Sequence, residues 1–283
     1  MKILVTGSNG QLGKSLLARR PDDVSMTGID RDDVDIAVAD DVAAFVKREK
    51  PDLIVNAAAY TAVDQAESEE DDARRVNVFG ARNLAATGVR LIHVSTDFVF
   101  DGEARDPYKP DDATNPLSAY GLSKRDGEIA VRELSPENSI VLRTAWLYSE
   151  FGGNFVDTML RLMRSRDELR VVNDQVGSPT WARSLADVIL AIAKSDWRPG
   201  AYHWTDGGQC SWYDFAVAIH DEALDLGLLD KAVAIRPIPS TEYPVPAARP
   251  SYSVLDCTST MAEFDVAQTP WRDNLRSMLE EMS

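Results

Sequence analysis

Cysteine and histidine are scarce in this chain of 283 residues. The two cysteines, Cys210 and Cys257, lie far apart without C-x-x-C spacing, and the three histidines show no spacing typical of metal ligands. This pattern argues against a disulfide framework and against a zinc site, and it favours two free thiols in a reducing cytoplasm. We therefore expect no bound metal, and we interpret His93, which lies within a predicted strand, as a core residue.

Long hydrophobic runs are absent as well. No segment approaches the roughly 18 uninterrupted apolar residues that a transmembrane helix needs. The N-terminal segment MKILVTG has one lysine and a short apolar run before a glycine-rich turn. Such a segment suits a buried first strand and not a signal peptide. We therefore expect a cytoplasmic protein with no membrane-spanning segment.

Lysine is rare, and the net charge is strongly negative. Only 8 of the 30 basic residues are lysine, whereas 31 of the 46 acidic residues are aspartate, and the formal net charge is -16. Such a surface repels nucleic acid and anionic lipid, so neither is an expected partner. Because aspartate-rich, lysine-poor surfaces suit a salt-rich cytoplasm, where salt screens self-repulsion, we also expect a halophilic source.

The first half of the chain alternates short apolar runs with amphipathic stretches. This alternation is typical of βαβ units on a parallel sheet whose two faces are covered by helices. The predicted strands are Lys2–Thr6, Ser25–Ile29, Leu53–Asn56, Leu91–Ser95 and Ile140–Arg143. The predicted helices are Gln11–Arg19, Asp40–Lys50, Asp71–Ala86 and Ser118–Leu134.

The pattern changes after about residue 145, and no low-complexity linker or internal repeat follows. The later predicted helices are Asn154–Arg164, Arg183–Lys194, Trp212–Leu226 and Asp273–Met282. We expect one compact α/β unit with two lobes. Residues 1–145 mainly form a Rossmann-type, doubly wound lobe with a parallel sheet, and residues 146–283 form a smaller substrate-binding lobe interleaved with the first.

A glycine-rich turn follows the first predicted strand. Residues 7–13 read GSNGQLG, so that Gly7, Gly10 and Gly13 have the spacing G-x-x-G-x-x-G. Glycines permit the tight turn and the close approach of backbone to a pyrophosphate, and the following helix offers free amide groups. The first spacing differs from the G-x-G-x-x-G fingerprint and indicates the short-chain dehydrogenase type. Its place after a terminal strand predicts dinucleotide binding.

The residue at the end of the second strand bears on which dinucleotide binds. Asp30 lies about twenty residues after the glycines, where a carboxylate can accept hydrogen bonds from the adenosine ribose hydroxyls and favour NAD(H). Arg31 follows at once and could bind a 2′-phosphate, or be a surface charge near Asp32 and Asp33. The preference between NADPH and NADH therefore stays open.

Three further residues have the chemistry of carbonyl reduction. Tyr120 and Lys124 have the spacing Y-x-x-x-K, which places both on one face of a helix. A neighbouring ammonium and an oxidised nicotinamide both favour the phenolate, so Tyr120 can give its proton to a carbonyl oxygen. Thr96, in Ser95-Thr96-Asp97, ends the fourth strand at the edge where open α/β sheets bind ligands. Its hydroxyl can polarise the same carbonyl.

Together these segments strongly resemble the dTDP-4-dehydrorhamnose reductases, members of the extended short-chain dehydrogenase family. The resemblance runs over nearly the whole chain. It rests on the segments Asn56–Asp64, Ser95–Phe100, Tyr120–Lys124, Arg143–Tyr148 and Asn173–Thr180. The last, with the pattern N-D-Q-x-G-x-P-T, separates this family from other extended short-chain enzymes better than the glycines do.

The resemblance implies NAD(P)H-dependent reduction of the C4 ketone of dTDP-4-dehydro-β-L-rhamnose to dTDP-β-L-rhamnose. It implies that Tyr120 is the proton donor, that Lys124 tunes it and holds the nicotinamide ribose, and that Thr96 lies beside the carbonyl. The implied cofactor-binding residues are Gly7, Gly10, Gln11, Leu12, Gly13, Asp30, Asp35, Ile36, Ala59, Tyr60, Thr61, Tyr120 and Lys124. The implied substrate-binding residues are Thr96, Asp97, Trp146 and Arg249.

Two of the substrate residues have a second interpretation. Trp146 is bulky and could be core between the lobes. Arg249 suits bidentate contact with a diphosphate, but it could form a surface ion pair instead. The chain also departs from the family twice: Phe98 stands where a tyrosine is frequent, and Ser15 stands where some bacterial members have an acidic residue for magnesium at a dimer interface. The second departure argues against a magnesium-linked homodimer.

Two alternative functions remain open. One is another nucleotide-sugar reductase, epimerase or dehydratase, although a dehydratase usually has Asp-Glu after the threonine and here Phe98 follows Asp97. The other is a non-catalytic regulatory subunit, because a relative of these reductases serves a methionine adenosyltransferase in that way. Retention of Thr96, Tyr120 and Lys124 favours the enzyme.

Overall fold

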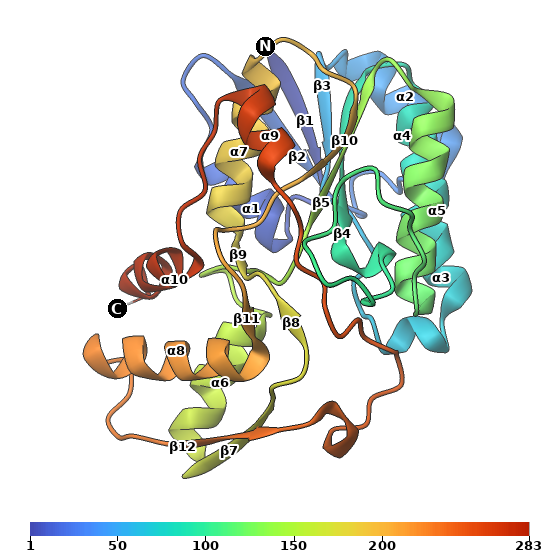
Figure 1. Cartoon of the computed structure of the whole chain (residues 1–283). Helices are drawn as coiled ribbons and strands as arrows, with labels where there is room; N and C mark the ends of the chain where they lie inside the picture. The colour runs from blue at the N-terminus through green and yellow to red at the C-terminus, as the bar shows by residue number, and fades with distance from the viewer. Residues whose placement is uncertain (283) are drawn as a thin grey trace.

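A six-stranded parallel sheet lies at the centre of the computed structural model, which describes residues 1–282 (Figure 1). The strands are β1 (Lys2–Thr6), β2 (Ser25–Ile29), β3 (Leu53–Asn56), β4 (Arg90–Thr96), β5 (Ser139–Thr144) and β10 (Gly200–His203). Their order is β10-β5-β4-β3-β1-β2. The five predicted strands are confirmed. The chain runs outward from β1 to β2 and then returns to β3 on the other side of β1. The strand order therefore reverses between β1 and β3, and ligands of such sheets bind at the carboxyl ends of the strands at this point.

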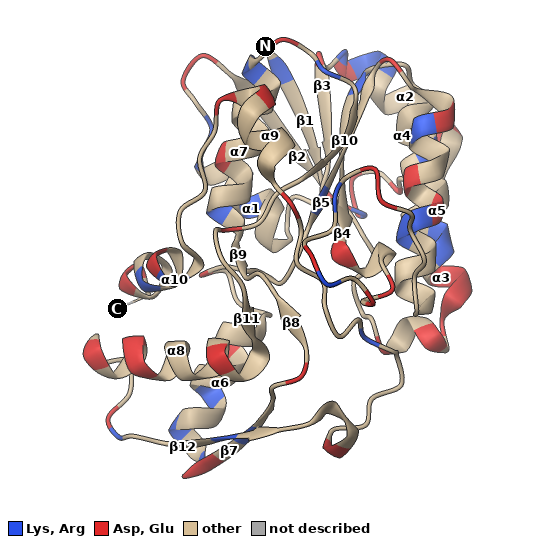
Figure 2. Ribbon diagram, viewed as in Figure 1, with Lys and Arg blue, Asp and Glu red and all other residues tan. Residues whose placement is uncertain are grey.

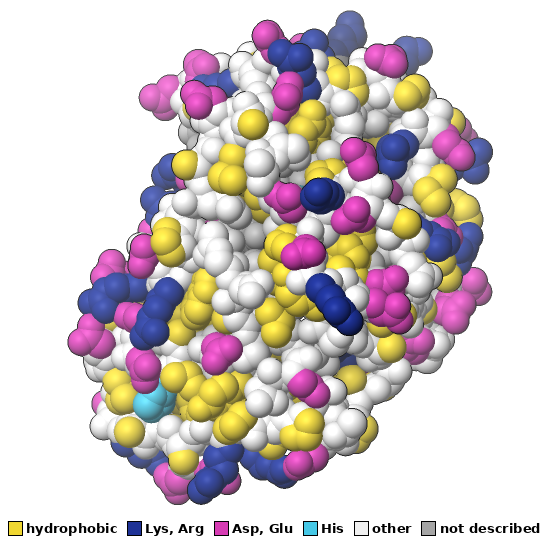
Figure 3. All heavy atoms as spheres, in the orientation of Figure 1, with side chains coloured by type: hydrophobic (Ala, Val, Ile, Leu, Met, Phe, Trp, Pro, Cys, Tyr) yellow, Lys and Arg dark blue, Asp and Glu magenta, His cyan; other side chains and the backbone are white. Residues whose placement is uncertain are grey.

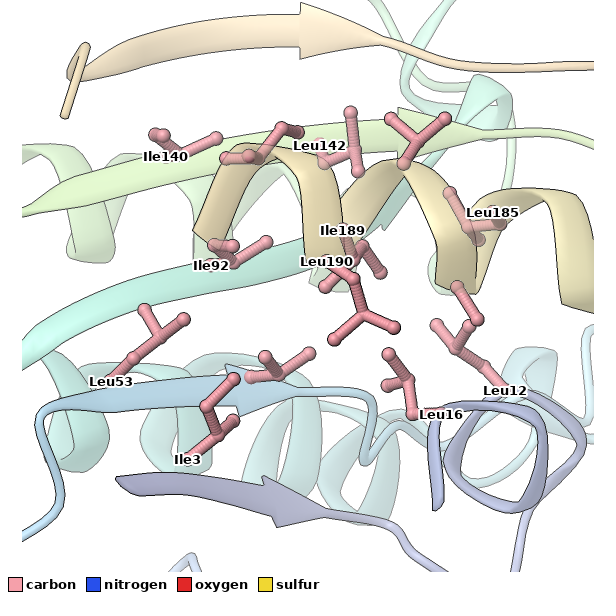
Figure 4. Packing of buried hydrophobic residues seen from close by; sticks show 14 of the residues in the cluster. Ile3, Leu12, Leu16, Leu53, Ile92, Ile140, Leu142, Leu185, Ile189 and Leu190 are labelled. Atoms are coloured by element: carbon pink, nitrogen blue, oxygen red, sulfur yellow. The ribbon is translucent and has the colours of Figure 1, made fainter. Parts of the chain in front are cut away.

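Helices cover both faces of this sheet. They are α1 (Gln11–Ala18), α2 (Ala39–Glu49), α4 (Ala81–Ala85), α5 (Ala119–Leu134) and α7 (Ala182–Lys194). On one face Ile3 and Val5 of β1 cluster with apolar residues of α1 and α7 (Figure 4). Leu4 points to the other face and clusters with residues of α2, α4 and α5. The predicted doubly wound α/β fold is confirmed, and burial on both faces explains the continuous apolar runs.

The helical sequence predicted around Asp71–Ala86 is confirmed, but its middle part is widened into a π-helix. The structure has α3 (Glu70–Arg74), a π-helical segment η2 (Arg75–Gly80) and then α4. Within η2 the buried Asn77 donates from Nδ2 to Ser123 Oγ over 2.9 Å, and its Oδ1 accepts from the Tyr60 amide over 2.9 Å. These contacts join segments far apart in the sequence, so helical periodicity alone could not reveal the widened turn.

The C-terminal half builds a second hydrophobic cluster and also returns to the sheet. The cluster forms between α6 (Phe155–Ser165), β7 (Glu168–Val172), α8 (Trp212–Asp225), β12 (Ala234–Ile238) and α10 (Trp271–Glu280). β7 and β12 pair in parallel, whereas β10 pairs with β5 at the edge of the main sheet. The helices were predicted within two residues of these bounds, but the strands β7, β10 and β12 were not predicted.

The remaining elements are short. They are η1 (Gln65–Glu67), η3 (Asp97–Val99), β6 (Leu147–Tyr148), β8 (Val176–Gly177), β9 (Thr180–Trp181), β11 (Cys210–Ser211), η4 (Ser240–Glu242) and α9 (Thr258–Phe264). β6 pairs with β9 and β8 with β11, so that the chain just after β5 is tied to the loops of the C-terminal half.

Acidic side chains are spread over the surface. Figure 2 shows them concentrated at α3 and along α8, and Figure 3 shows them interspersed with lysine and arginine over the visible face. Within residues 1–282, the structure contains no helix that is both long and apolar enough to span a membrane.

Candidate active site

A cavity of about 890 Å³ opens at the carboxyl edge of the sheet, against residues of the C-terminal half. Residues from the ends of β1, β3 and β4, from α5 and from the segment after β5 all line it. The structure brings every predicted site residue to this cavity. They are Gly7, Gly10, Gln11, Leu12, Gly13, Asp30, Asp35, Ile36, Ala59, Tyr60, Thr61, Thr96, Asp97, Tyr120, Lys124, Trp146 and Arg249.

The glycine turn has a shape that side chains would block. Gly7 has a φ of 68°, and a Cβ there would lie 2.7 Å from the backbone of Ala58. A Cβ on Gly13 would lie 2.3 Å from the Gly7 carbonyl oxygen. Gly10 donates to that same oxygen over 3.1 Å and caps the N-terminus of α1. The turn therefore presents bare backbone and free helix amides to the cavity, as pyrophosphate binding requires.

The part of the cavity next to β2 contains both groups that left the choice between NADPH and NADH open, Asp30 and Arg31. Asp30 Oδ2 accepts from the Asn9 amide over 3.0 Å, and Oδ1 accepts from the Arg31 amide over 2.8 Å. These bonds fix the carboxylate beside the glycine turn, while the exposed Arg31 also lines the cavity. Asp35 forms an ion pair with Arg75, a lining residue that was not predicted.

Tyr120 stands at the start of α5 as a protonated phenol. The helix begins there because Ser118 Oγ accepts from the Gly121 amide over 3.2 Å. Burial raises the pKa of Tyr120 to about 12, against the effect of the Thr96 hydroxyl, and the charge of Asp97 raises it further. The Phe98 ring packs edge-on against Tyr120, with 5.6 Å between centroids. The residue can therefore act as a proton donor.

Lys124 is also buried, one turn further along α5. Its Nζ donates to the Val94 carbonyl oxygen over 2.8 Å. Burial lowers the pKa of Lys124 to about 8, and the carboxylate of Glu128 opposes this shift. The ammonium is held against β4 and not against the phenol. Its remaining hydrogens are free to reach ligand hydroxyl groups in the cavity.

Thr96 and Asp97 lie beside Tyr120 at the end of β4. Thr96 Oγ1 donates to Asp97 Oδ1 over 3.0 Å and accepts from the Phe98 amide over 3.2 Å. Burial raises the pKa of Asp97 to about 6, although hydroxyl groups of Ser253 and Thr96 oppose the change. Asp97 is 1% exposed and lines the cavity, so its carboxyl is placed to bind groups that enter it.

Two tryptophans from the C-terminal half, Trp146 and Trp212, line another part of the cavity. Trp146 adopts the left-handed conformation, with a φ of 48°, and its indole stacks on Trp212 with centroids 3.5 Å apart. A Cβ on Gly177 would lie 2.6 Å from this indole. Trp146 thus packs against the C-terminal cluster and lines the cavity as well. Trp212 was missed, because an aromatic residue at the first position of a helix carries no functional pattern.

Arg249 forms the ion pair that the sequence left open. Its Nη1 and Nη2 donate to Asp64 Oδ1 and Oδ2 over 3.0 and 2.9 Å, and the guanidinium holds the pKa of Asp64 below its usual value. Arg249 also lines the cavity. The pair joins the segment after β3 to the segment before α9, across the mouth of the site.

Comparison with known proteins gives the same picture over the whole chain. Residues 1–283 match the family described as the RmlD substrate binding domain. A dTDP-4-dehydrorhamnose reductase of Aggregatibacter actinomycetemcomitans is 42% identical over 288 residues, which cover 98% of each chain. Among solved structures, a dTDP-4-dehydrorhamnose reductase of Clostridium acetobutylicum superposes with a TM-score of 0.93 at 40% identity, covering 100% of this chain and 99% of the other. One of Bacillus anthracis, in complex with NADP, has a TM-score of 0.92 at 36% identity and 99% coverage of both.

Proposed function

We propose, from the premise that the chain belongs to the RmlD substrate binding domain family, that it reduces the C4 ketone of dTDP-4-dehydro-β-L-rhamnose to dTDP-β-L-rhamnose with NADPH or NADH. Relatives about 40% identical over the full length carry the name of this reductase. The observation that carries the proposal is that the Tyr120 phenol, the Thr96 hydroxyl and the Lys124 ammonium meet in one cavity with the glycine turn.

The residues present fit a nicotinamide dinucleotide. Gly7, Gly10 and Gly13 leave a cradle that a Cβ would fill, and α1 begins at this cradle. We assign the pyrophosphate to this turn, together with Gln11 and Leu12, and the adenosine to Asp30, Asp35 and Ile36. Ala59, Tyr60 and Thr61 follow β3 and line the middle of the cavity. When bound, the reduced nicotinamide supplies a hydride to the carbonyl carbon.

The chain's own residues manage the proton and the carbonyl oxygen. Tyr120, protonated because burial raises its pKa, donates its proton to the oxygen as negative charge develops there. Thr96 donates a hydrogen bond to the same oxygen. Lys124 binds the ribose hydroxyls, a role that fits its position against β4. It then favours the Tyr120 phenolate after proton transfer.

The substrate residues occupy the other walls of the cavity. Asp97 accepts from sugar hydroxyls, and the Trp146 indole, fixed by its stack on Trp212, bounds the sugar. For Arg249 we propose diphosphate contact from within its Asp64 ion pair, since a guanidinium paired on one edge keeps donors on the other.

Substrate turnover tests the function directly. Loss of NADPH and of NADH would be followed in parallel with enzymatically generated dTDP-4-dehydro-β-L-rhamnose, at low and high salt. We expect turnover by the wild type and almost none by Tyr120→Phe. A folded wild type that binds the cofactor but reduces no substrate would contradict the reductase and favour a regulatory role.

We further propose a cytoplasmic homodimer built from two-lobed chains divided near residue 145. The proposed division is supported by the second hydrophobic cluster, and interleaving by the pairing of β10 with β5. The dimer is supported by exposed apolar side chains of Phe79 on η2 and of Leu122 and Ile129 on α5. Ser15 is buried, donates to the Gln11 carbonyl oxygen and supplies no carboxylate, so the dimer that we propose has no magnesium link at this position. Light scattering with and without a chelator would test this assembly, and a monomer would contradict it.

A further inference from the structure

A buried ion pair lies directly behind the active-site end of α5. Glu128 is one helical turn beyond Lys124, and its side chain is 4% exposed. Arg143 of β5, 2% exposed, binds it through one edge of the guanidinium: Nε donates to Oε1 over 2.9 Å and Nη2 to Oε2 over 2.7 Å. Burying two charges costs much desolvation free energy, so a pair of this kind contributes little net stability, and stability alone does not account for it.

The pair is fixed from several elements. Ser95 of β4 donates from Oγ to Glu128 Oε1. Arg143 Nη1 donates to the Pro110 carbonyl oxygen over 3.0 Å and to His203 Nε2 over 3.2 Å. His203 is then the tautomer whose Nδ1 donates to the Tyr108 carbonyl oxygen over 3.0 Å. The Glu128 carboxylate is therefore locked in place.

Lys124 lacks a direct acidic partner, because its Nζ donates to the neutral Val94 carbonyl. On the elements packed around it, the other buried titratable or charged groups are Tyr120 and Glu128 of α5, His93 of β4, Asp97 of η3 and Arg143 of β5. Burial lowers the pKa of His93, which keeps its ring neutral. Of these groups it is Glu128 whose charge opposes the burial of the ammonium.

We propose that Glu128 is a positioning residue for the cofactor, whose locked negative charge keeps the buried Lys124 ammonium protonated and so able to donate to the nicotinamide ribose. The inference rests on the proposed function, because it takes the ribose contact of Lys124 from there. Arg143 acts one step further back, since its bidentate pair holds the carboxylate in its place. The charge of Glu128, and not merely its packing, is what the site uses.

The test is the pH dependence of NADPH affinity, measured by fluorescence titration without substrate. For the wild type we expect affinity to fall as the pH rises through about 8, where Lys124 loses its proton. In Glu128→Gln the fall should begin about one pH unit lower, since losing a neighbouring opposite charge moves a buried lysine by that order. Between the pH at which the variant begins to lose affinity and the pH at which the wild type does, the variant should bind NADPH up to about tenfold more weakly. At lower pH the two proteins should bind it equally well.

Three variants separate charge from packing. Glu128→Asp keeps the charge and should show the pH dependence of the wild type. Ser95→Ala removes a hydrogen bond but no charge, and it should also leave the pH dependence of NADPH affinity unchanged. If Glu128→Gln fails to fold, the double variant Glu128→Leu with Arg143→Met removes both charges without orphaning either, and it should show the fall in affinity at the lower pH. Coincident pH curves for the wild type and the folded variant would overturn the inference alone. A wild type that binds neither NADPH nor NADH would overturn the proposed function and this inference with it.

Discussion

Gly7 and Gly88 form a natural matched pair for testing whether the glycine turn is a fitted cradle. Both have a left-handed backbone, with φ of 68° and 73°. An added Cβ on Gly88 would meet nothing within 4 Å, whereas on Gly7 it would lie 2.7 Å from the backbone of Ala58. Alanine at either site should cost about 1–2 kcal/mol through backbone strain. At Gly7 overpacking against the backbone just after β3 should add about 1–3 kcal/mol.

The assay pairs chemical denaturation with NADPH titration of Gly7→Ala and Gly88→Ala. We expect Gly7→Ala to be less stable than Gly88→Ala by about 1–3 kcal/mol in the free energy of unfolding. Its NADPH affinity should fall at least about tenfold, equivalent to roughly 1.4 kcal/mol, because the turn must move away from β3. Gly88→Ala should bind normally, since Gly88 lies outside the cavity. Equal effects of the two substitutions on stability and on affinity would refute the cradle.

The other predictions concern chemistry and charge. Tyr120→Phe should lower turnover by about 10²–10⁴ while NADPH affinity in fluorescence titrations stays nearly normal. Lys124→Ala should lower both, and normal NADPH affinity in this variant would contradict its ribose role. Because the net charge is -16, raising salt from about 0.1 M to about 1 M should raise the thermal midpoint and the activity. A protein equally stable and active at both salt concentrations would contradict the halophilic source.

The first half of the fold was readable from the sequence because its signals are local. Leu4, Ile54 and Val141 belong to apolar runs that are buried on both faces, and the cavity is lined where these runs end, by Thr6, Ala57 and Thr144. The glycine spacing and the Y-x-x-x-K pair are also local patterns. The residues that they identified all line the cavity in the structure. Chain order alone placed these segments at one edge of the sheet.

The second half was less readable because its contacts are distant in sequence. The strand β10, Gly200–His203, contains one alanine and one tyrosine between a glycine and a histidine, which carries no strand pattern. It is a strand because β5 offers an open edge. Likewise β7 and β12 pair with each other across a long stretch of sequence, so neither is evident on its own. The helix α7 was predicted, but its sequence does not reveal that it packs on α1.

The Asn173–Thr180 segment shows how a family pattern acquires a physical reason. Nothing local explains a glycine at position 177, since it is not among the residues with positive φ. The explanation lies in the adjacent Trp146, whose indole occupies the space that a Cβ would need. The indole can sit there because Trp146 adopts a left-handed backbone and stacks on Trp212. Strain of that kind persists only when the surroundings enforce it, so the segment, the indole and its stacking partner make up one wall of the site.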